Sequence, residues 1–414
     1  MVRPSVALVL VALVTAGCGG PSSVGDAGVP LKCHELPFTV TGAPAVLDAT
    51  LSSNTFSVPL TVGATQKQAV VDTGAPVTLI DPAAFPGETL PRAQGTLGRL
   101  SLGSLTATDV TVVASPVGAS TADGPVPALV GGDFLCHFTT SFDYRQPRVF
   151  LGDSPLPMDL AAPVTVTAPV LGGGQGALPV GGQIVVVKLP ATRIVVTGTL
   201  DGVERTFVLD SGASLNVLKP EVFTALTADG RKTLGGLAAA TVMGSAELTV
   251  ARAKTVTVGG ASAQGVLVAS INSPLFQSLG FEVGRPVDGL LGGTFLREFF
   301  VTVDYAGEQV TLRRYPTRAH VKDEFTRAGL ALQPITTATP GTPHYEVAQV
   351  FPGSDAATKG LSVGTGVVSI DGVALEPLGL EAANALLLGD AGATKAVETP
   401  GGTVMVQVED LLGS

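Results

Sequence analysis

Hydrophobic and polar residues alternate in short runs along most of the chain, and Gly- or Pro-containing turns separate these runs. Residues 56–71 (FSVPLTVGATQKQAVV) alternate with a period of two, turn near Gly63, and then become apolar. Such alternation, rich in Val and Thr, is typical of half-buried strands. The pattern therefore predicts a mainly β protein. Before residue 318, short helical turns are expected at residues 82–85, 220–226 and 293–298.

The same pattern occurs twice, in the same order. Residues 56–80 (FSVPLTVGATQKQAVVDTGAPVTLI) match residues 193–218 (RIVVTGTLDGVERTFVLDSGASLNVL), which turn near Gly202. Further along each copy, ALVGGDFLCHFTTSFDY (residues 128–144) matches GLLGGTFLREFFVTVDY (residues 289–305). Two ordered matches indicate a duplicated fold.

We therefore expect two β-rich lobes, at residues 38–160 and 161–318, with the crossing between them at residues 155–183. Each lobe has an ordinary domain size. Of the 414 residues, 45% are hydrophobic and 14% are charged, which excludes a disordered chain. The net charge of −10, with no basic stripe, argues against a nucleic-acid partner.

In each copy an apolar strand ends in Asp-Thr/Ser-Gly, within VVDTGA (residues 70–75) and VLDSGA (residues 208–213). The strand carries a carboxyl group inward, and the glycine allows a sharp turn beneath it. The hydroxyls of Thr73 and Ser211 can bond across to the other lobe. The candidate site residues are Asp72, Thr73, Gly74, Asp210, Ser211 and Gly212.

Two such loops facing each other would place two carboxyl groups within a few ångströms. Like charges that close cannot both ionise, so the pair shares one proton. One carboxylate can then act as general base on a water while its partner donates to a carbonyl oxygen. This chemistry needs no metal and no other cofactor, and we predict neither.

These motifs resemble those of the pepsin and retropepsin families of aspartic peptidases. Each motif is followed by the apolar-apolar-Gly element of those families, at residues 129–131 (LVG) and 290–292 (LLG). The resemblance implies a bilobal aspartic-peptidase fold, built from retropepsin-like β-barrel lobes, that holds an extended polypeptide substrate between the lobes. It also implies that Asp72 and Asp210 are the catalytic pair, supported by Thr73 and Ser211.

The chain departs from that resemblance in three ways. Pro76 stands where pepsins usually have Ser or Thr, and the segments expected to be flaps, residues 92–102 and 237–248, lack the pepsin Tyr. Ala75 and Ala213 follow the two motifs, as in retropepsins. Without a hydroxyl there to stabilise the ionised form, the pKa of the pair should be higher. We expect activity at weakly acidic to near-neutral pH.

The first residues read as an export signal. Residues 1–17 begin with a positive charge and continue with an apolar run too short to span a bilayer. Residues 15–18 (TAGC) resemble the lipobox of bacterial lipoproteins, although Thr15 replaces the usual Leu or Val. The resemblance implies lipidation of Cys18, a flexible tether over residues 18–37, and anchoring in the bacterial cell envelope, at the outer membrane. Ordinary signal cleavage that leaves Cys18 free is the alternative.

Two cysteines remain, Cys33 and Cys136. In an oxidising compartment they could form a disulfide that pins the tether to the first lobe. Two unpaired buried thiols are the alternative. The four histidines are scattered, and we interpret them as surface or turn residues rather than metal ligands.

Residues 323–412 follow a different pattern. Residues 345–375 (YEVAQVFPGSDAATKGLSVGTGVVSIDGVAL) predict a strand, a short helix near 356–359, and a second strand at 367–370 that ends in a turn at Asp371-Gly372. This resembles bacterial PDZ domains, an α+β fold. The resemblance implies that protein C-termini bind against a helix at residues 380–388. The peptide-binding residues would be Gly329, Leu330, Ala331 and Leu332.

The sequence therefore favours an aspartic endopeptidase with a C-terminal PDZ-like domain and a lipid anchor as its only link to a membrane. A catalytically inactive peptide-binding lipoprotein is the main alternative. A structural envelope protein is the third possibility, and it predicts that Asp72 and Asp210 lie far apart.

Overall fold

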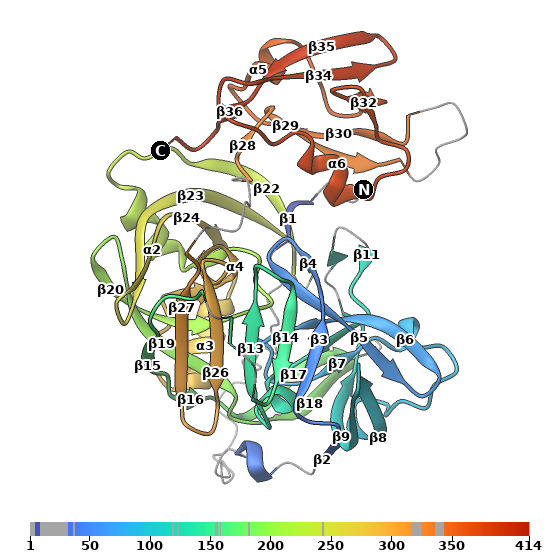
Figure 1. The fold of residues 1–414 in the computed structure, drawn as a ribbon, viewed down its shortest axis with the longest axis vertical. Coiled ribbons are helices and arrows are strands. Elements are labelled where there is room, and N and C mark those ends of the chain that lie inside the picture. The colour runs from blue at the N-terminus through green and yellow to red at the C-terminus, as the bar shows by residue number, and fades with distance from the viewer. Residues whose placement is uncertain are drawn as a thin grey trace.

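The computed structural model describes residues 5–8, 32–35, 38–117, 120–121, 124–153, 156–157, 159–180, 183–241, 244–316, 324–335 and 343–413. Cys18 and most of the expected signal and tether lie outside the described residues. The fold is mainly β, as the alternating pattern predicts. Figure 1 shows an N-terminal lobe (blue to teal) next to a second lobe (green to gold), with a C-terminal module (red) at one end.

The N-terminal lobe is built on an eight-stranded sheet. In its long hairpin, alternate residues of β5 are buried, including Phe56, Val58 and Leu60, and the strand turns at Gly63, which has a φ of 58°. The period-two alternation thus gives a strand with one face in the core. The strands of this sheet, in spatial order, are β2 (Thr39–Thr41), β9 (Leu105–Ala114), β7 (Leu79–Ile80), β12 (Ala128–Val130), β6 (Thr65–Val71), β5 (Thr55–Val62) and β4 (Thr50–Ser52), with β8 (Gln94–Leu102) pairing with β5 and β9.

The second lobe repeats this plan in a nine-stranded sheet. Its hairpin turns at Asp201 and Gly202, which both have positive φ, as the repeat predicts. In each lobe the apolar-apolar-Gly strand runs parallel to the strand that ends in Asp: β12 beside β6, and β25 beside β20. The strands, in spatial order, are β1 (Ser5–Leu8), β22 (Leu234–Thr241), β23 (Gly244–Val258), β24 (Ala261–Ile271), β21 (Asn216–Leu218), β25 (Gly289–Leu291), β20 (Val203–Leu209), β19 (Arg193–Leu200) and β16 (Val170–Leu171).

A six-stranded sheet joins the two lobes. At its centre β13 and β26, which come from matched positions of the repeat, pair antiparallel with Phe142 opposite Val301. The strands, in spatial order, are β15 (Val164–Thr167), β27 (Gln309–Arg314), β26 (Phe299–Asp304), β13 (Thr139–Asp143), β14 (Arg148–Leu151) and β3 (Ala45–Asp48). Because both lobes contribute three strands, their relative position is fixed by backbone hydrogen bonds.

The expected crossing forms structure of its own. The hairpin of β17 (Gly174–Val180) and β18 (Gln183–Leu189) packs Val187 and Leu189 into the same buried cluster as Ala75 and Val77 of the N-terminal lobe. Gln94 of β8 exchanges two 2.7 Å hydrogen bonds with the backbone of Lys188. A second small hairpin, β10 (Ser120–Thr121) with β11 (Gly124–Pro125), contacts β22 of the other lobe.

The predicted helical turns are present with slightly different bounds: η2 (Pro82–Ala84), α2 (Pro220–Thr227) and α4 (Gly293–Leu296). Three further elements were not predicted: η1 (Cys33–Glu35), α1 (Gly132–Leu135) and α3 (Leu275–Val283). The apolar residues of α3 are buried against the second lobe: Leu275, Phe276, Leu279 and Val283. Among the described residues, no helix combines the length and apolar character needed to cross a membrane.

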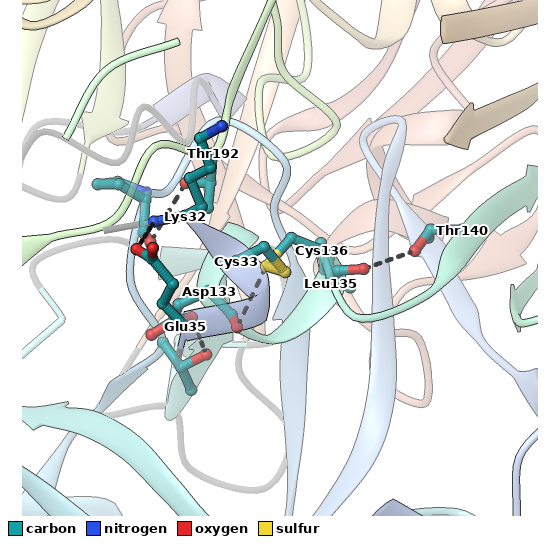
Figure 2. Close-up of a disulfide and its surroundings, with 10 residues drawn as sticks. Lys32, Cys33, Glu35, Asp133, Leu135, Cys136, Thr140 and Thr192 are labelled. Atoms are coloured by element: carbon teal, nitrogen blue, oxygen red, sulfur yellow. Dashed lines mark hydrogen bonds between the residues drawn. A yellow bond between two sulfur atoms is a disulfide. The ribbon is translucent and has the colours of Figure 1, made fainter. Parts of the chain in front are cut away.

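Cys33 and Cys136 form a disulfide, so the alternative of two free thiols is wrong (Figure 2). The bond joins η1 to the residue that follows α1. Phe38 stacks on His137 beside it, with ring centroids 4.0 Å apart. The start of the described lobe is thereby held against the loop that underlies its Asp motif.

The C-terminal module, residues 324–413, has three small sheets. They are β29 (Leu330–Pro334), β30 (Tyr345–Val350) and β31 (Gly366–Val367); β33 (Val373–Ala374), β32 (Ser369–Ile370), β34 (Thr394–Thr399) and β35 (Gly402–Gln407); and β28 (Thr326–Arg327) with β36 (Glu409–Asp410). Its helices are α5 (Asp355–Thr358) and α6 (Leu380–Ala385). The turn at Asp371-Gly372 is confirmed, with φ of 51° and 77°. The strand expected at 367–370 is divided in two, and the helix expected at 380–388 is shorter.

Candidate active site

Each Asp motif lies directly beyond a buried strand end. The backbone N–H of Asp72 donates to Val130 O and that of Asp210 to Leu291 O, each at 3.0 Å. In both lobes the parallel apolar-apolar-Gly strand thus holds the loop from one side. The first of the following glycines also leaves no room for a side chain, because a Cβ at Gly131 would lie 2.4 Å from the backbone of Val77.

The two loops bring the carboxyl groups of Asp72 and Asp210 together, close enough for each to affect the pKa of the other. Each carboxyl group also lies over the glycine of the opposite motif. A Cβ at Gly74 would be 2.3 Å from Cγ of Asp210, and a Cβ at Gly212 would be 2.3 Å from Cγ of Asp72. This arrangement excludes the possibility that the two acidic side chains are far apart.

The backbone of each loop also accommodates a charge. Oδ1 of Asp72 accepts from the N–H groups of Gly74 and Ala75, at 2.8 and 3.1 Å. Oδ1 of Asp210 accepts from Gly212 and Ala213, at 3.0 and 2.9 Å. One oxygen of each carboxyl group is therefore fixed by its own loop, which leaves the other oxygen for a reacting group.

The hydroxyls of Thr73 and Ser211 join the two loops, as the motifs predict. The N–H of Thr73 donates to Oγ of Ser211 (3.1 Å), whose hydroxyl donates to Val71 O (2.9 Å). The N–H of Ser211 donates to Oγ1 of Thr73 (3.0 Å), whose hydroxyl donates to Leu209 O (3.1 Å). Four buried hydrogen bonds thus hold the two carboxyl groups at a fixed separation.

Burial governs the protonation of the pair. Asp72 is 0% exposed and Asp210 is 1% exposed. Burial raises the pKa of Asp72 to about 6. Burial, with the charge of Asp72 next, raises the pKa of Asp210 well above its ordinary value. Because the two groups interact strongly, they titrate as a pair that shares one proton near neutral pH.

The segments expected to be flaps are strands. Residues 237–248 span the β22–β23 hairpin, whose tip lies outside the described residues. Residues 92–102 coincide largely with β8, which pairs with β9 in the sheet of the N-terminal lobe. Three described tyrosines, Tyr144, Tyr305 and Tyr315, directly follow β13, β26 and β27 of the six-stranded sheet, and all three are buried.

Several buried polar groups near the pair were missed by the sequence analysis. Burial raises the pKa of Asp133 to about 7, and its Oδ1 accepts from the hydroxyl of Thr78 at 2.7 Å. Arg193, at the start of β19, forms a buried ion pair with Glu282 of α3. Tyr144 recurs as Tyr305 in the repeat and could have been noticed there. Asp133 has Thr294 as its counterpart, and no local pattern marks it or the Arg193–Glu282 pair.

The residues expected to bind a peptide C-terminus lie at the start of β29. Gly329 has a φ of 65°, and Leu330, Ala331 and Leu332 are buried. The edge of β29 that faces α6 is occupied, because Asn384 bonds to both backbone groups of Leu332. It accepts from the N–H at 2.9 Å and donates to the carbonyl at 3.1 Å.

One group of potential metal ligands lies close together in the described part of the chain: Cys33, Cys136 and His137. Both sulfur atoms are joined in the disulfide, so they offer no thiolate. Burial lowers the pKa of His137 to about 4. These residues form a packed structural cluster.

Three comparisons show which known proteins the chain is similar to. A family model described as "Aspartyl protease" matches residues 196–295, which include the end of β19, all of β20 and the Asp210 motif. A search of curated proteins found no match. Among solved structures, the chain is similar to the aspartic proteinase from Irpex lacteus, at 14% identity and a TM-score of 0.42, over 67% of this chain and 99% of that one. It is also similar to a retropepsin-like aspartic protease from Rickettsia conorii, at 16% identity and a TM-score of 0.21, over 30% of this chain and 82% of that one. The family match and the β fold support a protease function.

Proposed function

We propose that this protein is an aspartic endopeptidase that hydrolyses peptide bonds with Asp72 and Asp210. The observation that carries the proposal is the pair of buried carboxyl groups, each held by its own loop and lying over the glycine of the opposite motif, with the two loops joined through Thr73 and Ser211. An Asp that only stabilises a turn does not need a second buried carboxyl group beside it. Two carboxyl groups that share a proton must lie close together.

In the proposed reaction the ionised carboxylate removes a proton from a water molecule, whose oxygen attacks the peptide carbonyl carbon. The protonated carboxyl group donates to the carbonyl oxygen, and a tetrahedral diol forms. The diol collapses when the C–N bond breaks. The carboxyl group that took the water proton donates it to the leaving nitrogen, and its partner takes a proton from a diol hydroxyl. The products are a carboxylic acid and an amine, and the pair regains its single shared proton.

Cleavage of casein or a peptide library, with and without pepstatin, tests this proposal. Asp72→Asn and Asp210→Asn should each abolish cleavage without unfolding the protein. Asp133→Asn is the matched control, because this residue is also buried and also has a raised pKa, but lies outside the pair. Absence of cleavage from about pH 3 to 8 by folded protein would instead favour an inactive peptide-binding protein.

We propose that the C-terminal module is a PDZ-like domain that recruits protein C-termini. The Ser354-capped helix α5, the turn at Asp371 and the packing of α6 against β29 support this assignment. Peptide addition along β29 would require Asn384 to release the backbone of Leu332. Fluorescence anisotropy with a library of labelled C-terminal peptides would test for binding. Equal binding of amidated peptides would contradict carboxylate recognition.

We also propose that Cys18 is lipidated and anchors the protein in a bacterial cell envelope, at the outer membrane. The disulfide supports export, because such bonds persist in oxidising compartments. Metabolic labelling with a radioactive fatty acid should mark the wild-type protein and not Cys18→Ala. Equal labelling of both proteins would place the lipid elsewhere.

A further inference from the structure

Arg193 and Glu282 form an ion pair that is buried in the second lobe. Arg193 Nε donates to Oε1 of Glu282 at 2.9 Å, and its NH2 group donates to Oε2 at 3.0 Å. The two side chains are 2% and 3% exposed. Removing two charges from water costs several kcal/mol per ion, and apolar residues of similar size often stabilise a protein as well or better. Packing alone therefore does not account for this pair.

The position of Arg193 is set by the strand that carries Asp210. In the β19–β20 ladder Val195 lies opposite Val208. Continuing this antiparallel register by two residues brings Arg193 level with Asp210. The preceding residue, Thr192, contacts the other lobe, where its hydroxyl donates to Pro76 O and a Cβ at Gly132 would touch it. Arg193 thus lies level with the strand end that carries Asp210, next to a residue that contacts the other lobe.

We propose that Arg193, held in place by Glu282, is a positioning residue whose buried positive charge stabilises the carboxyl pair in its singly ionised form. This inference rests on the proposed function, because it assigns a role within the same site. It agrees with the direction of the electrostatic effect: the charge of Arg193 lowers the pKa of both Asp72 and Asp210, against the larger opposing effect of burial.

The other titratable groups near the carboxyl pair are either neutral or negatively charged, whereas Arg193 is positively charged. Tyr144 interacts with Asp210, and Tyr305 interacts with Asp72 and Asp133. Burial raises the pKa of both tyrosines, so they stay neutral, and each hydroxyl is buried without a hydrogen-bond partner among the described residues. Asp133 adds negative charge when it ionises. Arg193 is therefore the cation that offsets burial at this site.

The test compares pH–rate profiles of full-length Arg193→Met, Glu282→Gln and the double variant. Arg193→Met should move the acidic limb of the profile upward by about one pH unit, because an opposite charge is lost. Glu282→Gln should move it downward, because the remaining cation is no longer balanced. The double variant should lie between wild type and Arg193→Met. A purely structural pair would instead give shifts of the same sign or none.

Arg231→Met is the matched control. Arg231 is also partly buried and bonds to two carboxylates, those of Asp201 and Asp229, but it is not among the groups that shift the pKa of the pair. It should lose stability without a shift in the profile. If a single variant leaves an unpaired buried charge and fails to fold, the neutral double variant decides, and an unchanged acidic limb in it overturns the proposal.

A titration that needs no turnover separates this inference from the proposed function. Carbon-13 NMR of carboxyl-labelled aspartate, assigned with Asp72→Asn and Asp210→Asn, follows the pair directly. If wild-type protein cleaves no substrate, the proposed function fails, yet the same shifts between variants should still appear. Identical carboxyl titrations in wild type and Arg193→Met would refute the role of Arg193.

Discussion

Replacing Ser211 with Ala should destabilise the protein strongly, although it removes a single oxygen atom. The hydroxyl of Ser211 accepts from the N–H of Thr73 and donates to Val71 O, and all three residues are buried. The substitution leaves a backbone donor and a backbone acceptor without a partner. Each unsatisfied buried group costs about 1–3 kcal/mol, so the expected loss is about 2–6 kcal/mol. This is a large share of the about 5–15 kcal/mol that stabilises a typical domain.

Ser214→Ala is the matched control. Ser214 lies three residues further along the same loop and is equally buried, at 2% exposed, but its Oγ has no hydrogen-bond partner among the described residues. Because this oxygen makes no hydrogen bond among the described residues, its removal leaves no donor or acceptor without a partner. The free energy of unfolding should therefore change by less than about 0.5 kcal/mol, or increase.

Equilibrium unfolding in urea, followed by far-ultraviolet circular dichroism, measures both variants. The slope with urea should be unchanged, so that the difference in midpoint reports stability. The reasoning would be refuted if Ser211→Ala and Ser214→Ala had equal midpoints. Peptidase activity of Ser211→Ala should also fall, because the loops that align Asp72 and Asp210 are no longer joined on that side.

Three other outcomes are expected. Raised carboxyl pKa values stabilise the fold below pH 4, and this stability is lost as pH rises; a rise from 3.8 to about 6 for Asp72 corresponds to about 3 kcal/mol. Melting temperatures at pH 4 and pH 8 should therefore differ more for wild type than for Asp72→Asn, and equal differences would contradict the burial effect. Reducing the Cys33–Cys136 bond, which spans a sequence separation of 103, should cost about 2–5 kcal/mol, and unchanged urea midpoints would contradict this. Asn384→Ala should bind C-terminal peptides several-fold more tightly than wild type, since β29 is no longer occupied; weaker binding would show that Asn384 assists the peptide.

Much of the site was accessible from the repeat. Two apolar strands that end in Asp-Thr/Ser-Gly must meet if the halves pair, and the central sheet of β13 and β26 shows that they do. The hydroxyl contacts of Thr73 and Ser211 follow from the same duplication. These contacts could be predicted because the two copies have the same fold, so that a residue in one copy has the same surroundings as its counterpart in the other.

The remaining features depend on contacts that the sequence does not mark. Arg193 and Glu282 are 89 residues apart, and neither belongs to a motif. The sequence could not decide between a disulfide and two free thiols, because it does not give the distance between Cys33 and Cys136. The helix α3 reads as an apolar stretch in which strand and helix have similar signals. Asn384 lies in a helix that was expected, but its bonds to Leu332 were not, because they depend on β29 lying beside that helix.

The complete burial of Asp72 and Asp210 affects how the protein would respond to an inhibitor. Because neither carboxyl group is exposed to solvent, a peptide-like inhibitor can contact them only after the protein around them moves. Its onset rate should rise with concentration at first and then level off at the rate of that movement. Slow-onset inhibition with a ceiling would thus measure an internal motion of the protein rather than its encounter with the inhibitor.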